Sequence, residues 1–441
     1  MRLRVRWLAA LVPLVLLSAC ARGSVSTGAS TPTATASATH TPALSDRGLC
    51  PAPLASFPNC YTPYQFRQAY GVQPLTDQGM IGKGQTVVLI ESFGSPTAQR
   101  DINTFDQQFG LPPVSLKILS PLGTTPFDPG NSDMVGWAEE TELDTQVVHA
   151  LAPGANIVIL TSPVSETEGT IGLPQFLQLE QYAVQQHLGA VVSQSWGASE
   201  ATLADSGGQH VIQQFASFYQ QATTQNGVTF IASSGDNGAI DYTDLQATQL
   251  ATNRTTSFPA DVPWVTAAGG TMLYKKDSGF SEVAWPESGG GVSKFFAEPD
   301  YQKTLPASDQ SLLGSHRGVP DVAADAAGVG SGDTGLAVYL NGQWTMSSGT
   351  STASPIWAAN IAIADEIAGH PLGFINPGLY KLAQSSTYAR DFRDVTQGDN
   401  SCCPPNPVRG FSAGPGWDAV TGLGTPQAAR LLPDLIAALA G

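Results

Sequence analysis

The stretch "VTFIASSGDNG", residues 228 to 238, joins an apolar, β-branched run to a loop of small and polar residues. Such a run is typical of a strand that is buried on both faces of a sheet. Four other stretches have the same character: "TVVLIE" (86–91), "NIVIL" (156–160), "GAVVSQSW" (189–196) and "WVTAAGG" (264–270). Together the five runs predict a parallel β-sheet.

Longer stretches with helical spacing lie between these strands, such as "GWAEETELDTQVVHALA" (136–152) and "QFLQLEQYAVQQHLG" (175–189). Alternation of buried strands and helices predicts an α/β fold, a parallel sheet with helices on both faces. A hairpin is expected at 336–347, where Asn341-Gly342 suits a type I′ turn. Because no repeat or second linker interrupts residues 50–441, we expect one large domain there.

The chain is acidic and has few charges. Its 441 residues have a formal net charge of -16, and only 13% of them are charged. Nucleic acid is excluded as a partner, because phosphate binding needs clustered Lys and Arg. The composition suits an exported or acid-exposed protein.

Residues 1–19 are predicted to be a signal peptide, with three arginines followed by the apolar run "WLAALVPLVLL". They end in Leu17-Ser18-Ala19, and with Cys20 this segment resembles a bacterial lipobox, which implies lipidation of Cys20. The alternative is an ordinary cleaved signal. Residues 20–49 are rich in Ser, Thr and Pro and are expected to form a disordered tether. We therefore expect an extracytoplasmic protein that is lipid-anchored to the bacterial cell membrane, or shed from it.

Four cysteines remain after Cys20, and four cysteines allow three pairings. We prefer a local disulfide between Cys50 and Cys60. The neighbours Cys402 and Cys403 could pair with each other or tie the two ends of the domain together. Zinc binding is the weaker interpretation, because neither pair has C-x-x-C spacing.

A candidate nucleophile lies in "SSGTSTASPIW" (347–357), where Ser351 precedes an apolar helical run. A serine hydroxyl needs a base to activate it. Of the six histidines, only His149 lies near a polar cluster. A histidine-dependent subtilisin-like site is not supported, because no H-G-T segment occurs and the first strand ends in Glu91-Ser92-Phe93-Gly94 instead of D-[ST]-G.

Carboxyl groups are the other candidates for the base. The helix near 137–150 carries Glu139, Glu140, Glu142 and Asp144, of which Glu140 and Asp144 share one face. At ~4 Å two carboxylates repel by about 4 kcal/mol, so a close pair holds one proton between them. The alternative is an acidic first turn that complements the helix dipole. Asp236 follows a buried strand and, taken alone, suits a capped turn.

Six ordered motifs together resemble the sedolisin family of serine-carboxyl peptidases, which have a subtilisin-like fold. They are "YTPYQFRQAYG" (61–71), "ETELDTQVVHALAPGA" (140–155), "SQSWG" (193–197), "SSGDNG" (233–238), "RGVPDVAADA" (317–326) and "SGTSTASP" (348–355). The resemblance covers most of residues 60–430 and implies a single large catalytic domain.

The resemblance also implies a role for each of four side chains. Ser351 would be the nucleophile, Glu140 its general base, and Asp144 the group that holds Glu140. Asp236, kept protonated, would donate a hydrogen bond to the oxyanion together with the Ser351 backbone N–H. An acidic pH optimum is expected, because a carboxylate base of low pKa works best in acid.

Ser193, Trp196 and Gly197 resemble the family's substrate-lining strand, which would pair with an extended peptide. The implied substrates are peptides or proteins, and we expect a monomer. Family members usually carry a long folded pro-segment, whereas here only the tether occupies that place. The alternative function is a catalytically silent, lipid-anchored peptide-binding protein on a peptidase scaffold.

The segments "FRDVTQGDN" (392–400) and "SAGPGWDAVTGLGTP" (412–426) resemble the family's calcium site. One structural Ca²⁺ would be held by the carboxylates of Asp394 and Asp418 and by the backbone carbonyls of Val395, Gly414 and Gly416. Without the resemblance, two aspartates that cap their own turns would be the better interpretation.

Overall fold

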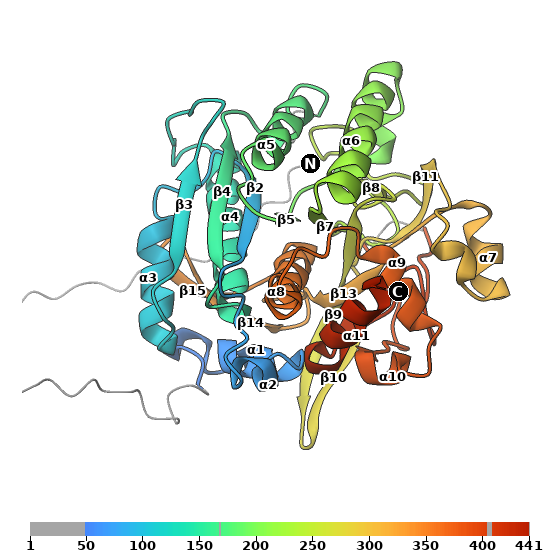
Figure 1. Ribbon diagram of the computed structural model, residues 1–441. Coiled ribbons are helices and arrows are strands. Elements are labelled where there is room, and N and C mark those ends of the chain that lie inside the picture. The colour runs from blue at the N-terminus through green and yellow to red at the C-terminus, as the bar shows by residue number, and fades with distance from the viewer. Residues whose placement is uncertain (1–48, 167–168, 404–407, 441) are drawn as a thin grey trace, which may run out of the picture.

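The computed structural model describes residues 49–166, 169–403 and 408–440. The predicted signal peptide and nearly all of the predicted tether, including Cys20, lie outside the described residues. The fold is built on one eight-stranded sheet (Figure 1). Across the sheet its strands are β10 (Gly279–Ala284), β9 (Thr266–Lys276), β7 (Thr229–Ser233), β5 (Val191–Gln194), β2 (Thr86–Ser92), β4 (Asn156–Ser162) and β3 (Ser115–Leu119), and β13 (Val322–Asp325) also pairs with β9.

All neighbouring strands of this sheet are parallel except β10, which returns antiparallel along β9. Helices cover both faces. They are α1 (Pro63–Ala69), α2 (Gln73–Thr76), α3 (Ala98–Phe109), α4 (Ser132–Leu151), α5 (Leu173–Gln185), α6 (Ser206–Gln225), α7 (Ala307–Leu313), α8 (Thr350–Ala368), α9 (Asn376–Ala383), α10 (Tyr388–Asp391) and α11 (Ala428–Ala440).

The alternation of side chains along each strand supplies two hydrophobic cores. On β2, Val87 and Leu89 belong to one core, whereas Val88 and Ile90 belong to the other. The first core is covered by α3, α4, α8, α9 and α11, and the second by α5 and α6. This two-sided burial explains why the strands read as continuous apolar runs.

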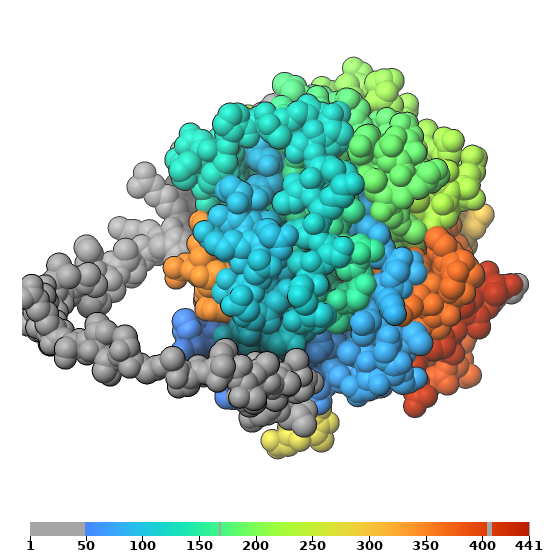
Figure 2. Space-filling model, turned by 60° about the vertical axis from the view of Figure 1, so that its left-hand side comes forward, coloured from blue at the N-terminus to red at the C-terminus, as the bar shows by residue number. Residues whose placement is uncertain are grey.

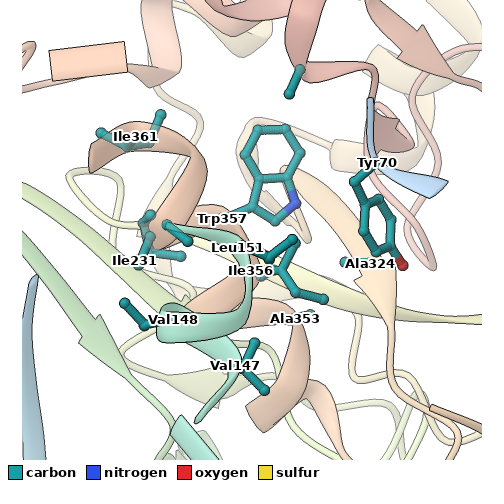
Figure 3. Packing of buried hydrophobic residues seen from close by; sticks show 14 of the residues in the cluster. Tyr70, Val147, Val148, Leu151, Ile231, Ala324, Ala353, Ile356, Trp357 and Ile361 are labelled. Atoms are coloured by element: carbon teal, nitrogen blue, oxygen red, sulfur yellow. The ribbon is translucent and has the colours of Figure 1, made fainter. Parts of the chain in front are cut away.

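Helix α8 lies at the centre of the first core. Ile356, Trp357 and Ile361 of α8 pack beside Val147 and Val148 of α4 (Figure 3). The apolar segment that follows Ser351 is therefore a buried helix. In Figure 2 the face turned toward the viewer is formed mainly by the N-terminal part of the described chain (blue to cyan). The C-terminal part (orange to red) lies at the right-hand edge of this face.

Smaller pairs of strands surround the sheet. They are β1 (Asn59–Tyr61) with β14 (Thr334–Leu340) and β15 (Gln343–Met346), β11 (Gly291–Ala297) with β12 (His316–Val319), β6 (Ala198–Ser199) with β8 (Ser257–Phe258), and β16 (Phe392–Arg393) with β17 (Thr425–Pro426). The hairpin predicted at 336–347 is confirmed as β14–β15. Its turn residues Asn341 and Gly342 have φ values of 46° and 80°, as a type I′ turn requires.

Both cysteine pairs of the domain are disulfides. Cys50 is joined to Cys60, which is the preferred pairing. Cys402 is joined to its neighbour Cys403, so of the two arrangements left open the structure contains the vicinal one. The predicted α/β fold is confirmed: the structure has a mainly parallel sheet with helices on both faces. Within the described ranges, no helix combines the length and apolar character needed to cross a membrane.

Candidate active site

Ser351 lies in the first turn of α8, two residues after a glycine that the site requires. Gly349 has a φ of 81°, and a Cβ atom placed on it would lie 2.6 Å from Asp236 Oδ2. Only glycine combines this left-handed conformation with such a close approach. In this turn the N–H of Thr350 donates to Asp236 and that of Thr352 donates to the Gly349 carbonyl. The N–H of Ser351 has no carbonyl four residues earlier in the helix, so it can bind an anion.

A proline in α8 helps to connect the helix to β5. Pro355 has no N–H, so the carbonyl of Ser351 lacks its usual partner four residues later. The hydroxyl of Ser195, just after β5, lies 3.2 Å from that carbonyl oxygen. The helix start is thereby held against the C-terminal end of the sheet, where α/β folds place their sites.

Glu140 faces the Ser351 hydroxyl closely enough for that hydroxyl to lower the pKa of its carboxyl group. It projects from the middle of α4, a helix that packs along α8. Burial raises the pKa of Glu140 to about 8; the nearby charge of Asp236 adds to the rise and the Ser351 hydroxyl opposes it. The expectation of a base with a low pKa is therefore wrong for the free protein, because the cleft removes this carboxyl group from water.

Asp144 lies one helical turn after Glu140 and is fully buried. The Ser195 hydroxyl lies 2.8 Å from each of its carboxylate oxygens. Burial and the charge of Glu140 raise the pKa of Asp144 well above its usual value. Glu142 lies on the other side of the helix, where Thr97 donates a hydrogen bond to it, so the structure separates it from this pair.

Glu91 at the end of β2 is a further member of the cluster that the sequence analysis missed. Its side chain is fully buried, and neither carboxyl oxygen has a hydrogen-bond partner. Burial and the charges of Asp144 and Glu140 raise its pKa well above the usual value. Because a buried carboxylate without a partner is very unfavourable, Glu91 holds a proton. Its place at the end of the first strand was the available signal.

Asp236 approaches the start of α8 from the opposite side. Its Oδ1 accepts hydrogen bonds from the N–H of Thr350 at 2.8 Å and from the Thr350 hydroxyl at 2.7 Å. Burial raises the pKa of Asp236, and the two hydrogen bonds from Thr350 oppose the rise. The loop after β7 thus places a carboxyl group beside the backbone of Ser351.

The structure does not place Ser193 in the cleft, which corrects one predicted binding residue. Ser193 lies inside β5, which pairs with β2 and β7 on its two sides. Its hydroxyl lies 2.8 Å from Ser354 Oγ in the core. Its backbone therefore has no free edge for a peptide, and the segment that lines a hollow begins two residues later, at Ser195.

Trp196 and Gly197 do line the cleft. A hollow of about 340 Å³ is bounded by Trp137, Glu140, Ser195 and Trp196, among others. A second hollow of about 100 Å³ shares Glu166 with the first, and it is also lined by Gly197, Ala198, Ser199, Thr202 and Asp241. Successive residues of 195–199 thus line two hollows that can hold side chains of an extended peptide.

The smaller hollow contains acidic side chains that the sequence analysis did not select. Burial raises the pKa of Glu166 to about 8, and the charges of Asp241 and Asp133 add to the rise. Burial also raises the pKa of Asp241, against the hydrogen bond that Ser257 donates to it. A larger hollow of about 810 Å³ near Trp264 and Tyr301 contains none of the predicted catalytic residues.

His149 is remote from the chemistry expected at Ser351. It is fully buried near the C-terminal end of α4, and its Nε2 atom lies 2.9 Å from the carbonyl oxygen of Pro112 and 3.1 Å from Asp106 Oδ1. Its role is to connect α4 to the end of α3, as expected for a packed histidine.

The residues of the predicted calcium site lie together after β16. Gly416 donates its N–H to Asp394 Oδ2 at 3.1 Å, and Gly414 donates to Asp418 Oδ2 at 3.0 Å. Asp394 Oδ1 is buried without a hydrogen-bond partner, so it fits a cation. Among the described residues no three His, Cys, Asp or Glu side chains form a metal cluster. Carbonyls such as that of Val395 would therefore have to supply several of the ligands.

In this structure a subtilisin-like sheet brings a carboxyl group, and not an imidazole, to a serine at the start of a helix. This is the arrangement of a serine-carboxyl peptidase. Residues 132–370 match the model of the Subtilase family. The chain belongs to this family and, within it, to the sedolisins.

Relatives agree with this placement. Kumamolisin from Bacillus sp. (strain MN-32) is 34% identical over 390 residues, which are 86% of this chain and 64% of kumamolisin. Tripeptidyl-peptidase 1 from Homo sapiens is 32% identical over 313 residues, 67% of this chain and 52% of that protein. The chain thus spans less than two thirds of the length of these relatives.

A solved structure shows the same architecture. Pseudomonas sedolisin, a serine-carboxyl proteinase complexed with two molecules of pseudo-iodotyrostatin, superposes with a TM-score of 0.69 at 26% identity. The match covers 85% of this chain and 97% of the sedolisin chain. A lanthipeptide protease, with a TM-score of 0.52 at 14% identity, shares the fold.

Proposed function

We propose that the protein is an endopeptidase that acts at acidic pH, exported and anchored to the bacterial membrane through Cys20, and active as a monomer. The observation that carries the proposal is the position of the Glu140 carboxyl group beside the Ser351 hydroxyl, where the two groups interact in a site removed from water. The position of Asp236 at the same helix start, and the similarity to kumamolisin, support it.

In the proposed reaction, Ser351 Oγ attacks the scissile carbonyl carbon while Glu140 takes the hydroxyl proton. The developing oxyanion accepts hydrogen bonds from the Ser351 N–H and from protonated Asp236. Glu140 then gives its proton to the leaving amine as the C–N bond breaks. Glu140 then removes a proton from a water molecule, which attacks the carbonyl carbon of the acyl-enzyme. As the bond to Ser351 Oγ breaks, Glu140 returns this proton to Ser351.

This mechanism requires a shared protonation state in the cluster. Glu140 must be ionised to act as a base, and Asp236 must be protonated to donate. Because these carboxyl groups interact, they titrate together, and the proposed reaction uses the protonation state in which Glu140 carries the one charge while Glu91, Asp144 and Asp236 hold protons. Loss of a further proton at higher pH, or gain of one at lower pH, lowers the rate, so the pH profile is bell-shaped.

Digestion of an unfolded protein and of a peptide library between about pH 3 and pH 7 tests the proposal. We expect cleavage by the wild-type protein and none by Ser351→Ala. If both proteins bind the peptides and neither cleaves them, the catalytically silent binding protein is the correct function. Fragment masses separate internal cleavage from removal of short terminal peptides.

The lipid anchor predicts a change in partitioning. Cys20→Ser should move the protein from the detergent phase to the aqueous phase or leave it unprocessed, because the tether has no apolar surface of its own. Phase partitioning of the two forms, followed by mass measurement of the mature N-terminus, provides the measurement. Equal partitioning of both forms into the aqueous phase would exclude the anchor.

We also propose that the loops after β16 hold one structural Ca²⁺, with Asp394, Asp418 and the carbonyls of Val395, Gly414 and Gly416 as ligands. The buried, unpartnered oxygen of Asp394 supports this site. An ion bound only by the folded state and present at 100 times its Kd adds about 2.7 kcal/mol, or roughly 3 °C in Tm for a domain of this size. We expect a chelator to lower the Tm and added calcium to restore it.

Asp394→Asn should remove this response, as read by thermal unfolding of Ser351→Ala protein, which cannot digest itself. Lys303→Gln, which alters only an exposed ion pair with Asp300, is the control and should respond like the parent. A Tm that changes with neither chelator nor calcium excludes the site.

A further inference from the structure

Two buried carboxyl groups lie directly behind the wall of the smaller hollow. Glu200 begins the 3-10 helix η4 (Glu200–Leu203), immediately after β6, and Asp261 lies in the segment between β8 and β9. Their exposed fractions are 1% and 0%. The hydroxyl of Ser293 on β11 lies 2.5 Å from Glu200 Oε1 and 3.1 Å from Asp261 Oδ2.

The hydrogen-bond count requires a proton in this cluster. Ser293 has one hydroxyl proton, and its oxygen already accepts the N–H groups of Phe295 and Phe296 at 3.1 Å. That single proton cannot serve two carboxylates. If both carboxyl groups were ionised, each would need a donor, and this one hydroxyl is the group that both of them contact. One proton therefore bridges the pair.

The surrounding charges do not replace that proton. Arg317, from β12, faces Asp261, but its guanidinium is already held by Asp321 at 2.5 and 2.8 Å. The Lys294 side chain on β11 and His210 on α6 are exposed to solvent. Burial, followed by the charge of Glu200, raises the pKa of Asp261 well above its usual value, and Arg317 only partly opposes the rise. The bridging proton is therefore assigned to Asp261.

The pair connects the pocket wall to the body of the protein. Lys294 N–H donates to Glu200 Oε1 at 3.0 Å and to Oε2 at 3.1 Å, which ties η4 to β11. Glu200 N–H donates to the carbonyl of Thr256 at 3.0 Å. Ser199 and Thr202, on either side of Glu200, line the smaller hollow. Movement of Glu200 would therefore move the residues that contact a bound peptide.

We propose that Glu200 and Asp261 are positioning residues, which hold the 197–202 wall in its peptide-binding position only while one proton bridges them. The link to substrate rests on the proposed peptidase function. As the pH rises the proton leaves, the two carboxylates repel, and the wall separates from β11. The protein then loses affinity for substrate, independently of the catalytic carboxyl groups.

The direction of the linked stability change follows from Asp261. A buried acid with a raised pKa in the folded state contributes stability that is fully present below about pH 4. That stability is lost as the pH rises through the folded-state pKa. An amide at position 261 donates a hydrogen bond to Glu200 at any pH, so Asp261→Asn should retain the closed wall above the pH at which the wild-type wall opens.

The test compares Ser351→Ala with Ser351→Ala/Asp261→Asn, so that neither protein cleaves its ligand. The Kd for a fluorescein-labelled peptide that the wild-type protein cleaves, and the Tm, are measured from about pH 4 to pH 8. One lost proton weakens binding by up to about tenfold per pH unit. We expect this loss in the parent and a flat Kd in the Asn variant. Glu200→Gln, which also removes the like-charge repulsion, is the second variant if Asp261→Asn does not fold.

Asp365→Asn is the matched control, because Asp365 is a buried acid whose pKa is raised by burial to about 7 but which contacts Leu372 and not the pocket. It should change the Tm profile and leave the Kd profile unchanged. Identical Kd profiles for the parent and the Asp261→Asn protein overturn the positioning role, even if the Tm profile flattens. If the wild-type protein cleaves no peptide at any pH, the proposed function fails, and the Tm profile of Asp261→Asn still decides whether the bridging proton exists.

Discussion

Glu140→Gln lowers kcat/KM by roughly 10⁴-fold or more, close to the loss expected for Ser351→Ala. An amide is nearly isosteric with the protonated acid, so the packing between α4 and α8 remains, but an amide cannot take the proton of Ser351. Initial rates with a fluorogenic peptide at the pH optimum provide the measurement, and an unchanged Tm shows that the variant is folded.

His149→Gln is the matched control on the same helix. It changes a buried side chain that contacts Pro112 and lies outside the cleft, so turnover should remain within about threefold of wild type, the effect of less than 1 kcal/mol. Full activity of Glu140→Gln, or loss of activity only in His149→Gln, would contradict the assignment of the base.

Asp236→Ala lowers kcat by roughly 10²- to 10³-fold with a smaller change in KM, because one of two oxyanion donors is removed and the hydrogen bond forms only as charge develops. Steady-state kinetics over the pH range give both constants. The high-pH limb of kcat should also change, since burial raises the pKa of Asp236 and its proton is needed for catalysis.

The variant Asp241→Asn distinguishes hydrogen-bond donation to the oxyanion from a role in substrate binding. Asp241 lines the smaller hollow, so its variant should alter KM and side-chain preference more than kcat. Equal effects of Asp236→Ala and Asp241→Asn on kcat would show that Asp236 acts by shaping the cleft and not by donating to the oxyanion.

The sequence was sufficient to predict those elements whose surroundings are the same along their whole length. The five apolar runs became strands because both of their faces are buried, and Asn341-Gly342 formed the expected turn because its φ values are local properties. β13 was not predicted, since "VAAD" (322–325) is mostly small residues with weak strand preference.

The site was only partly predictable, because it depends on strand order. Ser193 and Ser195 differ in sequence by two positions, yet only Ser195 extends past the sheet, and the number of residues that pair is not visible in an apolar run. Glu91 becomes part of the cluster because β2 lies beside β5. Glu200 and Ser293 are 93 residues apart and meet only through tertiary packing.

The burial of α8 has a consequence for motion. From Thr352 to Asp365 every side chain of this helix is buried, so its amide hydrogens exchange with solvent only when the whole domain opens. The pocket wall, in contrast, contains β6, a strand of two residues that pairs with the two residues of β8. The candidate nucleophile is thus carried by the last element of the domain to open. The surfaces that admit a peptide belong to the first elements to open. Substrate entry on the microsecond-to-millisecond scale therefore need not disturb the position of Ser351.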